Sequence, residues 1–223
     1  MTAPSILAFD LGTSGLKAAV VASSGALLDT EVVPLGVNLL PGGGAEQHPA
    51  DWWQAMVTAA GRLFSRGKAN PADVVGIGVS SQWGGTVACA ADSTPVRPAL
   101  IWMDARGSED ARALAGGFPQ IDGYGALKVQ AWIRKTGGAP SLSGKDPVGH
   151  IAWLRRTEPA TLEKAAVLLE PKDWVNFKLT GRAVHENLFF LTASIFKLSS
   201  IPELITLPGI LIHLVRVPEG CAT

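Results

Sequence analysis

Short apolar runs separated by turn residues open the chain. Residues 6–9 form the first run and lead into Asp10, residues 16–21 form the second, and residues 26–33 form the third. The segments between them are rich in Gly and Ser, and apolar runs bounded by such residues are typical of β-strands. The pattern therefore predicts three consecutive strands joined as antiparallel hairpins.

A helical period follows the Pro-Gly-Gly-Gly loop at residues 41–44. Pro49 suits the first position of a helix, where its missing N–H has no cost. Apolar residues recur every three or four positions from there to residue 65, which predicts a helix packed on a sheet through one face. The residues expected on that face are Trp53, Met56, Val57, Ala60, Leu63 and Phe64.

Two later apolar runs end in polar residues. Residues 74–79 predict a buried strand that carries the segment 80–85 at its end, and residues 86–91 are a candidate further strand. A shorter run at 98–103 ends at Asp104. Open α/β sheets bind ligands at the carboxyl ends of their strands, so both ends are candidates for chemistry.

The second half of the chain is predicted to be mainly helical. Helical patterns cover residues 108–114, 147–156 and 171–179, with Asp146 as N-cap of the second helix and Gly181 as the stop of the third. The residues expected to face inward from the second helix are Val148, Ile151, Ala152 and Trp153. Alternating strands and helices indicate an α/β fold, a mixed sheet flanked by helices.

Composition narrows the function classes. The chain has 223 residues, of which 47% are hydrophobic and 17% charged, so it can bury a core and is not intrinsically disordered. Nineteen basic residues balance nineteen acidic ones, which argues against a general nucleic-acid binder. The two cysteines form no CxxC motif and the four histidines are scattered, which excludes a disulfide scaffold or a zinc ribbon and predicts structural or surface roles for the histidines.

The expected location is the cytoplasm. The first residues, Met-Thr-Ala-Pro, lack the basic region of a secretory signal. The segment 187–223 is apolar, but charged residues and prolines interrupt it, whereas a membrane span needs about 18 nearly uncharged residues. We therefore expect no membrane partner.

The segment from Asp10 to Lys17, Asp-Leu-Gly-Thr-Ser-Gly-Leu-Lys, has the parts of a phosphate and magnesium site. Glycines let backbone N–H groups approach an anion, hydroxyls donate to it, and a carboxylate holds the metal, usually through its waters. The segment satisfies neither GxxxxGK[ST] nor GxGxxG. A hairpin turn with a solvated aspartate explains the same residues equally well.

Two further segments carry polar groups at strand ends. Gln-Trp-Gly-Gly at residues 82–85 is a candidate ligand contact, although Trp83 is equally explained as a core residue. In Trp-Met-Asp-Ala-Arg at residues 102–106, a carboxylate and a guanidinium lie two residues apart and either face a cleft or form an exposed pair.

In this order, the segments resemble the FGGY carbohydrate kinases, and within them the xylulokinase-like branch. The resemblance runs from residue 5 to about residue 186. It rests on six blocks, which are residues 9–17, 46–53, 76–85, 97–106, 152–154 with 158–159, and 171–174 with 179–181.

The resemblance implies the first lobe of an actin-like, ribonuclease-H-type ATPase fold, with the active site between two lobes. Such kinases use ATP and Mg²⁺ to phosphorylate a hydroxyl of a sugar or polyol. The cofactor-binding residues it implies are Asp10, Gly12, Thr13, Ser14 and Lys17, with Asp10 beside the metal. The substrate-binding residues it implies are Gln82, Trp83, Gly84 and Asp104.

The chain also departs from the family pattern. Trp83-Gly84 stands where xylulokinases usually have Met-His, which puts D-xylulose in doubt, and His150 stands where many members have lysine. The family's catalytic aspartate lies in a Gly-Asp-Gln or Gly-Asp-Asn motif of the second lobe, and neither motif occurs in this chain. We therefore assign no catalytic residue, and we expect the ATP-binding second lobe to be absent.

Residues 1–186 are predicted to form the N-terminal lobe, and residues 187–223 an unmatched apolar tail. One hypothesis is that a frameshift or rearrangement produced this tail, and the other is that it is a divergent continuation. A first lobe without its partner exposes apolar interlobe surface, which favours a homo-oligomer unless the tail covers it.

Three functions follow from the resemblance. The first is an ATP-dependent carbohydrate kinase by descent, with little or no turnover expected from this chain alone. The second is a non-catalytic sugar-binding or regulatory fragment. The third is another actin-fold ATPase, which the blocks at residues 46–53 and 102–106 argue against because they are typical of sugar kinases.

Overall fold

The computed structural model describes residues 3–136 and 138–184, so the tail predicted from residue 187 onward lies outside the described residues. Its largest sheet has four strands in the order β3-β2-β1-β6. The strands are β1 (Ser5–Leu11), β2 (Gly15–Ala22), β3 (Leu27–Pro34) and β6 (Val74–Ser81). The first three pair antiparallel, which confirms the predicted hairpins, and β6 pairs parallel with β1.

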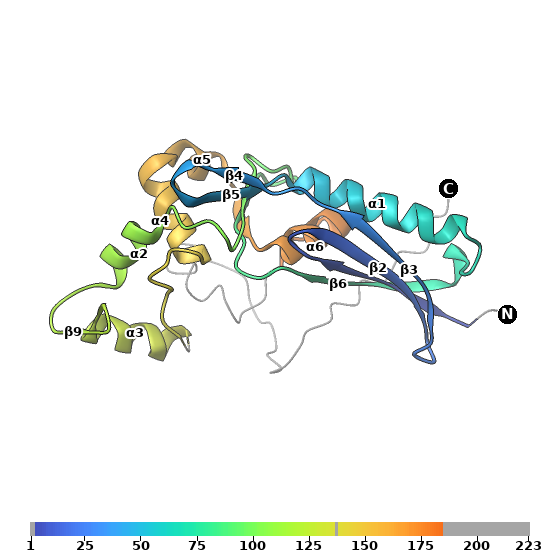
Figure 1. The fold of residues 1–223 in the computed structure, drawn as a ribbon, viewed down its shortest axis with the longest axis horizontal. Helices are drawn as coiled ribbons and strands as arrows, with labels where there is room; N and C mark the ends of the chain where they lie inside the picture. The colour runs from blue at the N-terminus through green and yellow to red at the C-terminus, as the bar shows by residue number, and fades with distance from the viewer. Residues whose placement is uncertain (1–2, 137, 185–223) are drawn as a thin grey trace.

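Helix α1 (Pro49–Ser65) has the predicted bounds and packs on this sheet (Figure 1). Its buried face contains Met56 and Leu63, as predicted. Trp52 rather than Trp53 is fully buried, and Val57 is half exposed, so its predicted inward position was wrong. The apolar band is wider than the contact with the sheet, and the residues at its margin remain partly in solvent.

Two smaller sheets and several helices complete the architecture. Strands β4 (Asn38–Leu40), β5 (Gly44–Gln47) and β8 (Ala99–Leu100) form one sheet, and β7 (Val87–Cys89) pairs with β11 (Val167–Leu169). The remaining elements are β9 (Gln120–Ile121), β10 (Tyr124–Gly125), α2 (Ser108–Ala115), α3 (Ala126–Thr136), α4 (Pro147–Thr157), α5 (Pro159–Lys164), α6 (Pro171–Thr180) and the 3₁₀ turns Pro41–Gly43 and Pro71–Asp73.

The predicted ends of two helices are confirmed. The Asp146 carboxylate accepts a hydrogen bond from the N–H of Gly149 at 2.9 Å, so it caps α4. Gly181 ends α6 in the left-handed conformation, with φ of 69°. From α4, Ile151 is buried as predicted, but His150 and Leu154 are buried more deeply than the other residues expected to face inward.

Helix α3 was not predicted, although its sequence is about as amphipathic as that of α1. Leu127 and Ile133 are both more than half exposed. Helices α2 to α5 gather at one end of the molecule, away from the outer part of α1 and the sheet (Figure 1). None of the helices in residues 3–136 and 138–184 is long and apolar enough to cross a membrane.

Candidate functional site

The parallel pairing of β1 and β6 brings the two predicted ligand segments together. Asp10 lies opposite Ser80 in the register, and the N–H of Gln82 donates to the carbonyl oxygen of Leu11 at 2.7 Å. Both strands end toward the group of helices α2 to α5 (Figure 1). The Asp10 loop and the Gln82 segment therefore share one edge of the sheet, where open α/β sheets bind ligands.

The turn after β1 presents charged groups to solvent. The carboxylate of Asp10 lies 3.6 Å from Nζ of Lys17, and both side chains are more than half exposed. The N–H of Gly12 donates to the carbonyl oxygens of Asp10 and Gly15, and a Cβ on Gly12 would lie 2.9 Å from the latter oxygen. Ser14 is also exposed. An exposed ion pair of this kind contributes little to stability.

The chemistry of Asp10 fits a magnesium ion held mainly by a nucleotide. Mg²⁺ is commonly bound by one or two carboxylates together with substrate phosphates and water. The part of the chain that the structure describes contains no group of three His, Cys, Asp or Glu side chains that could hold a metal on its own. Asp10 would supply one ligand, directly or through water.

Thr13, in the same turn, bonds side chains of two other segments. Its hydroxyl donates to Oε1 of Gln82 at 2.9 Å and accepts from the indole Nε1 of Trp102, also at 2.9 Å. Three segments that are far apart in the sequence therefore meet at one side chain. Trp102 was not among the predicted site residues, and its place in the block at residues 97–106 was the only signal for it.

Residues 83 and 84 occupy different environments. The side chain of Trp83 is half exposed, so it is not a core residue. Gly84 is buried with φ of 74°, and its Cβ position lies 3.4 Å from Cβ of Trp102. A glycine at this position allows the left-handed backbone and the close approach of Trp102.

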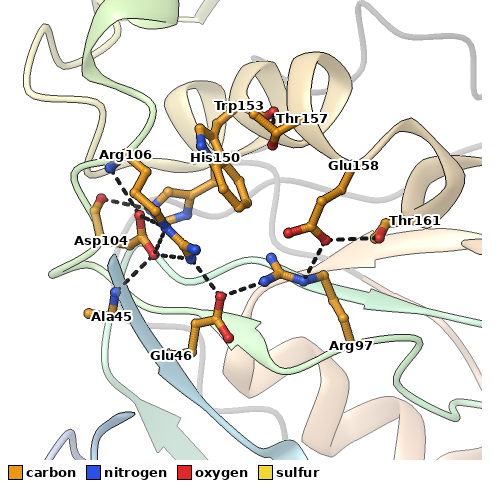
Figure 2. Close-up of polar contacts among 10 residues, drawn as sticks. All are labelled: Ala45, Glu46, Arg97, Asp104, Arg106, His150, Trp153, Thr157, Glu158 and Thr161. Carbon is orange, nitrogen blue, oxygen red and sulfur yellow. Dashed lines mark hydrogen bonds and ion pairs between the residues drawn. The ribbon is translucent and has the colours of Figure 1, made fainter. Parts of the chain in front are cut away.

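The side chain of Asp104 is buried, whereas a residue in contact with a ligand in an open site would be exposed. Its Oδ2 accepts from the N–H of Ala45 at 2.9 Å, and its Oδ1 accepts from the N–H of Arg106 at 3.0 Å. The guanidinium of Arg106 bonds both oxygens (Figure 2). Every contact of this carboxylate on the described chain is internal, and a role in binding sugar stays a prediction.

Glu46 connects Arg106 to a second arginine, as Figure 2 shows. Its Oε1 accepts from Nη2 of Arg106 and from Nη2 of Arg97, each at 2.5 Å. Arg97 also pairs with Glu158 at 3.3 Å, and the guanidinium of Arg106 lies 4.0 Å from the ring centroid of Trp153. Burial lowers the pKa of Arg106, but hydrogen bonds to Asp104 and Glu46 outweigh it and hold the pKa above its usual value. This cluster fixes β5, the loop after β8 and α4 to one another.

His150 is a neutral, buried member of the same region. Its Nε2 lies 3.3 Å from the carbonyl oxygen of Asp104, and its Nδ1 lies 3.0 Å from Oγ1 of Thr86. A carbonyl oxygen only accepts, so Nε2 carries the proton and Nδ1 accepts from the threonine hydroxyl. Burial lowers the pKa of His150 from 6.5 to about 4. These contacts agree with the structural role predicted for the histidines.

His150 should make folding sensitive to acid. Its pKa is lower in the folded chain than in the unfolded one, so the unfolded state binds more protons below about pH 6.5. Stability present at pH 7 should fall by roughly 2 kcal/mol as the pH drops to about 4.5. Urea unfolding at both pH values measures this loss. His150→Gln should show a smaller loss over the same interval, and an equal loss would contradict the assignment.

The sequence and structure of known proteins match this chain. Residues 5–188 match the N-terminal domain of the FGGY family of carbohydrate kinases. A xylulose kinase from Streptomyces coelicolor is 33% identical over 179 residues, which cover 80% of this chain and 34% of that protein. One from Bacillus subtilis is 28% identical over 186 residues, or 79% of this chain and 33% of that protein.

Solved structures agree on the fold. A structure described as a xyloylose kinase from Brucella ovis superposes with a TM-score of 0.67 at 27% identity, covering 79% of this chain and 34% of that chain. A gluconate kinase from Lactobacillus acidophilus gives 0.71 at 19% identity, covering 89% and 38%, and at that identity speaks for the fold alone. The fold is the actin-like first lobe that the resemblance implied.

The chain spans about a third of the length of the relatives it matches. The match to the family nevertheless covers most of the chain itself, and it includes the Asp10 turn, the Gln82 segment and the buried cluster around Asp104. This chain therefore belongs to the FGGY family of carbohydrate kinases and contains the N-terminal domain of that family.

Proposed function

We propose that this chain forms the sugar-binding and phosphate-loop lobe of an ATP-dependent kinase that phosphorylates a hydroxyl of a sugar or polyol. The observation that carries the proposal is the junction of Thr13, Gln82 and Trp102, which joins the Asp10 turn to the segments implied to bind substrate. Phosphoryl transfer requires that the phosphate and the accepting hydroxyl lie next to each other, and this junction spans both sites.

The exposed groups of the Asp10 turn suit the phosphate side of the reaction. Bound nucleotide with Mg²⁺ would supply the phosphoryl group. Asp10 would hold the metal directly or through water, and Lys17 and the hydroxyl of Ser14 would neutralise or bond phosphate oxygens. This reaction depends on positioning and charge neutralisation, which side chains of these types provide.

The hydroxyl side of the reaction lies around Gln82 and the two exposed indoles. Trp83 and Trp102 are each about half exposed. Trp83 follows Gln82 in the chain, and Trp102 donates to Thr13, whose hydroxyl bonds the amide of Gln82. Amide and hydroxyl groups bond sugar hydroxyls, and indole faces cover the apolar C–H surface of a sugar. Because Trp83-Gly84 stands where xylulokinases usually have Met-His, the imidazole is missing, and we propose a pentulose or polyol other than D-xylulose as substrate.

Isothermal titration calorimetry with D-ribulose, D-xylulose, ribitol and glycerol tests the proposal. We expect one of these compounds to bind the chain, and Gln82→Met to weaken its binding at least about tenfold by removing a bidentate polar partner. Gln54→Met makes the same chemical change at an exposed site on α1 and should leave binding unchanged. Binding that Gln82→Met does not affect would contradict the site.

A coupled assay of ADP release with the same compounds tests the second part of the proposal. The general base of the reaction is expected from a Gly-Asp-Gln or Gly-Asp-Asn motif, which the 223 residues lack. We therefore expect no sugar-dependent ADP release from a polypeptide of these residues. Robust release would show that another residue of this chain acts as the base.

A further inference from the structure

Gln47 is a buried amide whose role was not predicted. It lies on β5 next to Glu46, and the two side chains bond different partners, as expected where successive residues of a strand point to opposite faces. Glu46 bonds the two arginines of Figure 2. Gln47 bonds the turn after β1 and the segment after β6 instead. One strand therefore connects the buried ionic cluster to the proposed site.

Both atoms of the Gln47 side-chain amide, Nε2 and Oε1, make two hydrogen bonds each. Its Nε2 donates to the carbonyl oxygens of Thr13 and Gly36, at 2.8 and 2.9 Å. Its Oε1 accepts from Nε1 of Trp52 at 3.2 Å and from Nε2 of Gln82 at 2.7 Å. Carbonyl oxygens only accept and an indole N–H only donates, so a flipped amide would lose these bonds. The orientation of Gln47 is therefore fixed.

This orientation determines which atoms Thr13 presents. Because Nε2 of Gln82 must donate to Oε1 of Gln47, its own Oε1 faces Thr13 and accepts the single hydroxyl proton. The indole N–H of Trp102 donates to one lone pair of the Thr13 hydroxyl oxygen. Thr13 is left with a second lone pair and with no proton to donate.

We propose that Gln47 is a positioning residue of the site and that it makes Thr13 a hydrogen-bond acceptor for a substrate hydroxyl. A hydroxyl can donate to Thr13 and accept from the second N–H of Gln82, whereas a deprotonated phosphate oxygen can only accept. This assignment rests on the proposed function, and it places Thr13 on the sugar side of the site rather than among the phosphate contacts predicted for it.

Nuclear magnetic resonance of the ¹⁵N-labelled chain, observing indole N–H groups, tests the role of Gln47 without any ligand. Gln47→Met removes the acceptor that orients Gln82, so the resonance of Trp102 should shift although the two residues share no bond. Gln47→Glu keeps an acceptor for Trp52 and Gln82 but loses the donors to Thr13 and Gly36. It should therefore restore the Trp102 resonance close to its original position.

A purely structural role predicts a different pattern. Both variants lose the two donated bonds, so both would move the Trp102 resonance equally, and that result would overturn the proposal. Gln54→Met is the matched exposed control and should leave the Trp102 resonance where it is in the unaltered chain. The Trp153 resonance serves as the internal reference, because its ring packs on the arginines rather than on Gln47 or its bonded partners.

The acceptor role of Thr13 has its own test. Thr13→Val keeps the shape of the side chain and removes its oxygen. It should weaken the affinity for the sugar or polyol that binds in calorimetry at least about tenfold, whereas Thr13→Ser should retain most of that affinity. Inorganic sulfate, a tetrahedral oxyanion without an O–H group at neutral pH, should leave the Trp102 resonance of the original chain unmoved. A shift on sulfate addition would overturn the assignment. Failure of all four compounds to bind would contradict the proposed function, while the comparison of the Gln47 variants would still decide its positioning role.

Discussion

Replacing Gly107 with alanine should destabilise the chain by about 3 kcal/mol or more, because no space exists for a methyl group. A Cβ at this position would lie 2.2 Å from the carbonyl oxygen of Gly149. Gly144 packs against the same backbone, since its own Cβ would lie 2.3 Å from the carbonyl carbon of Gly107. These neighbours are backbone atoms, so relief requires that α2 and α4 move apart.

Urea unfolding followed by circular dichroism measures this effect, and Gly61→Ala is its matched control. Gly61 lies inside α1, and a Cβ there meets no atom within 4 Å. The same substitution should stabilise the chain by about 0.5–1 kcal/mol, because alanine favours a helix interior over glycine. If Gly107→Ala unfolds at the urea concentration of the unaltered chain, the close packing of α2 on α4 is wrong.

Glu46→Gln should cost about 3–5 kcal/mol of unfolding free energy, because it removes the carboxylate between two buried arginines. The side chains of Arg97 and Arg106 are only 10% and 14% exposed. Asp104 and Glu158 remain as partners of one arginine each, but neither replaces an oxygen that both guanidinium groups share. A charge that loses one of its partners in such surroundings is less well compensated, which is costly.

Asp110→Asn provides the control for this prediction, because it neutralises a carboxylate of a more exposed pair. Asp110 bonds Arg156, whose side chain is 53% exposed, so the loss should stay below about 1 kcal/mol. Thermal or urea unfolding of the two variants gives the comparison. Equal losses would show that the cluster around Glu46 contributes no more than a surface pair.

The strands and helices were predictable where the signal is local. The hairpins of β1 to β3 follow from apolar runs between turn residues, and α1 follows from Pro49 and a regular period. Helix α3 was missed although its sequence is about as amphipathic as that of α1, and its apolar side chains, such as Leu127, nevertheless remain in solvent.

The site was predictable only in part, because its contacts join distant residues. The Asp10 turn and the Gln82 segment were recognised as strand ends, and their adjacency follows from the parallel pairing of β1 with β6. The bond from Gln82 to Gln47 spans 35 residues of sequence, and no local pattern predicts it. For Asp104 the local pattern was misleading. A carboxylate at a strand end is expected to be exposed, but this one is buried by its bonds to Arg106 and Ala45.

The most direct test of the proposed sugar site is a titration of the ¹⁵N-labelled chain that follows its indole resonances. Adding the sugar or polyol that binds should shift Trp102 and Trp83 with a common, saturable dependence on concentration. Trp174, which is buried and donates to the carbonyl oxygen of Ser93, should not move. If saturating ligand leaves Trp102 and Trp83 unmoved, the sugar does not bind at the junction of Thr13, Gln82 and Trp102.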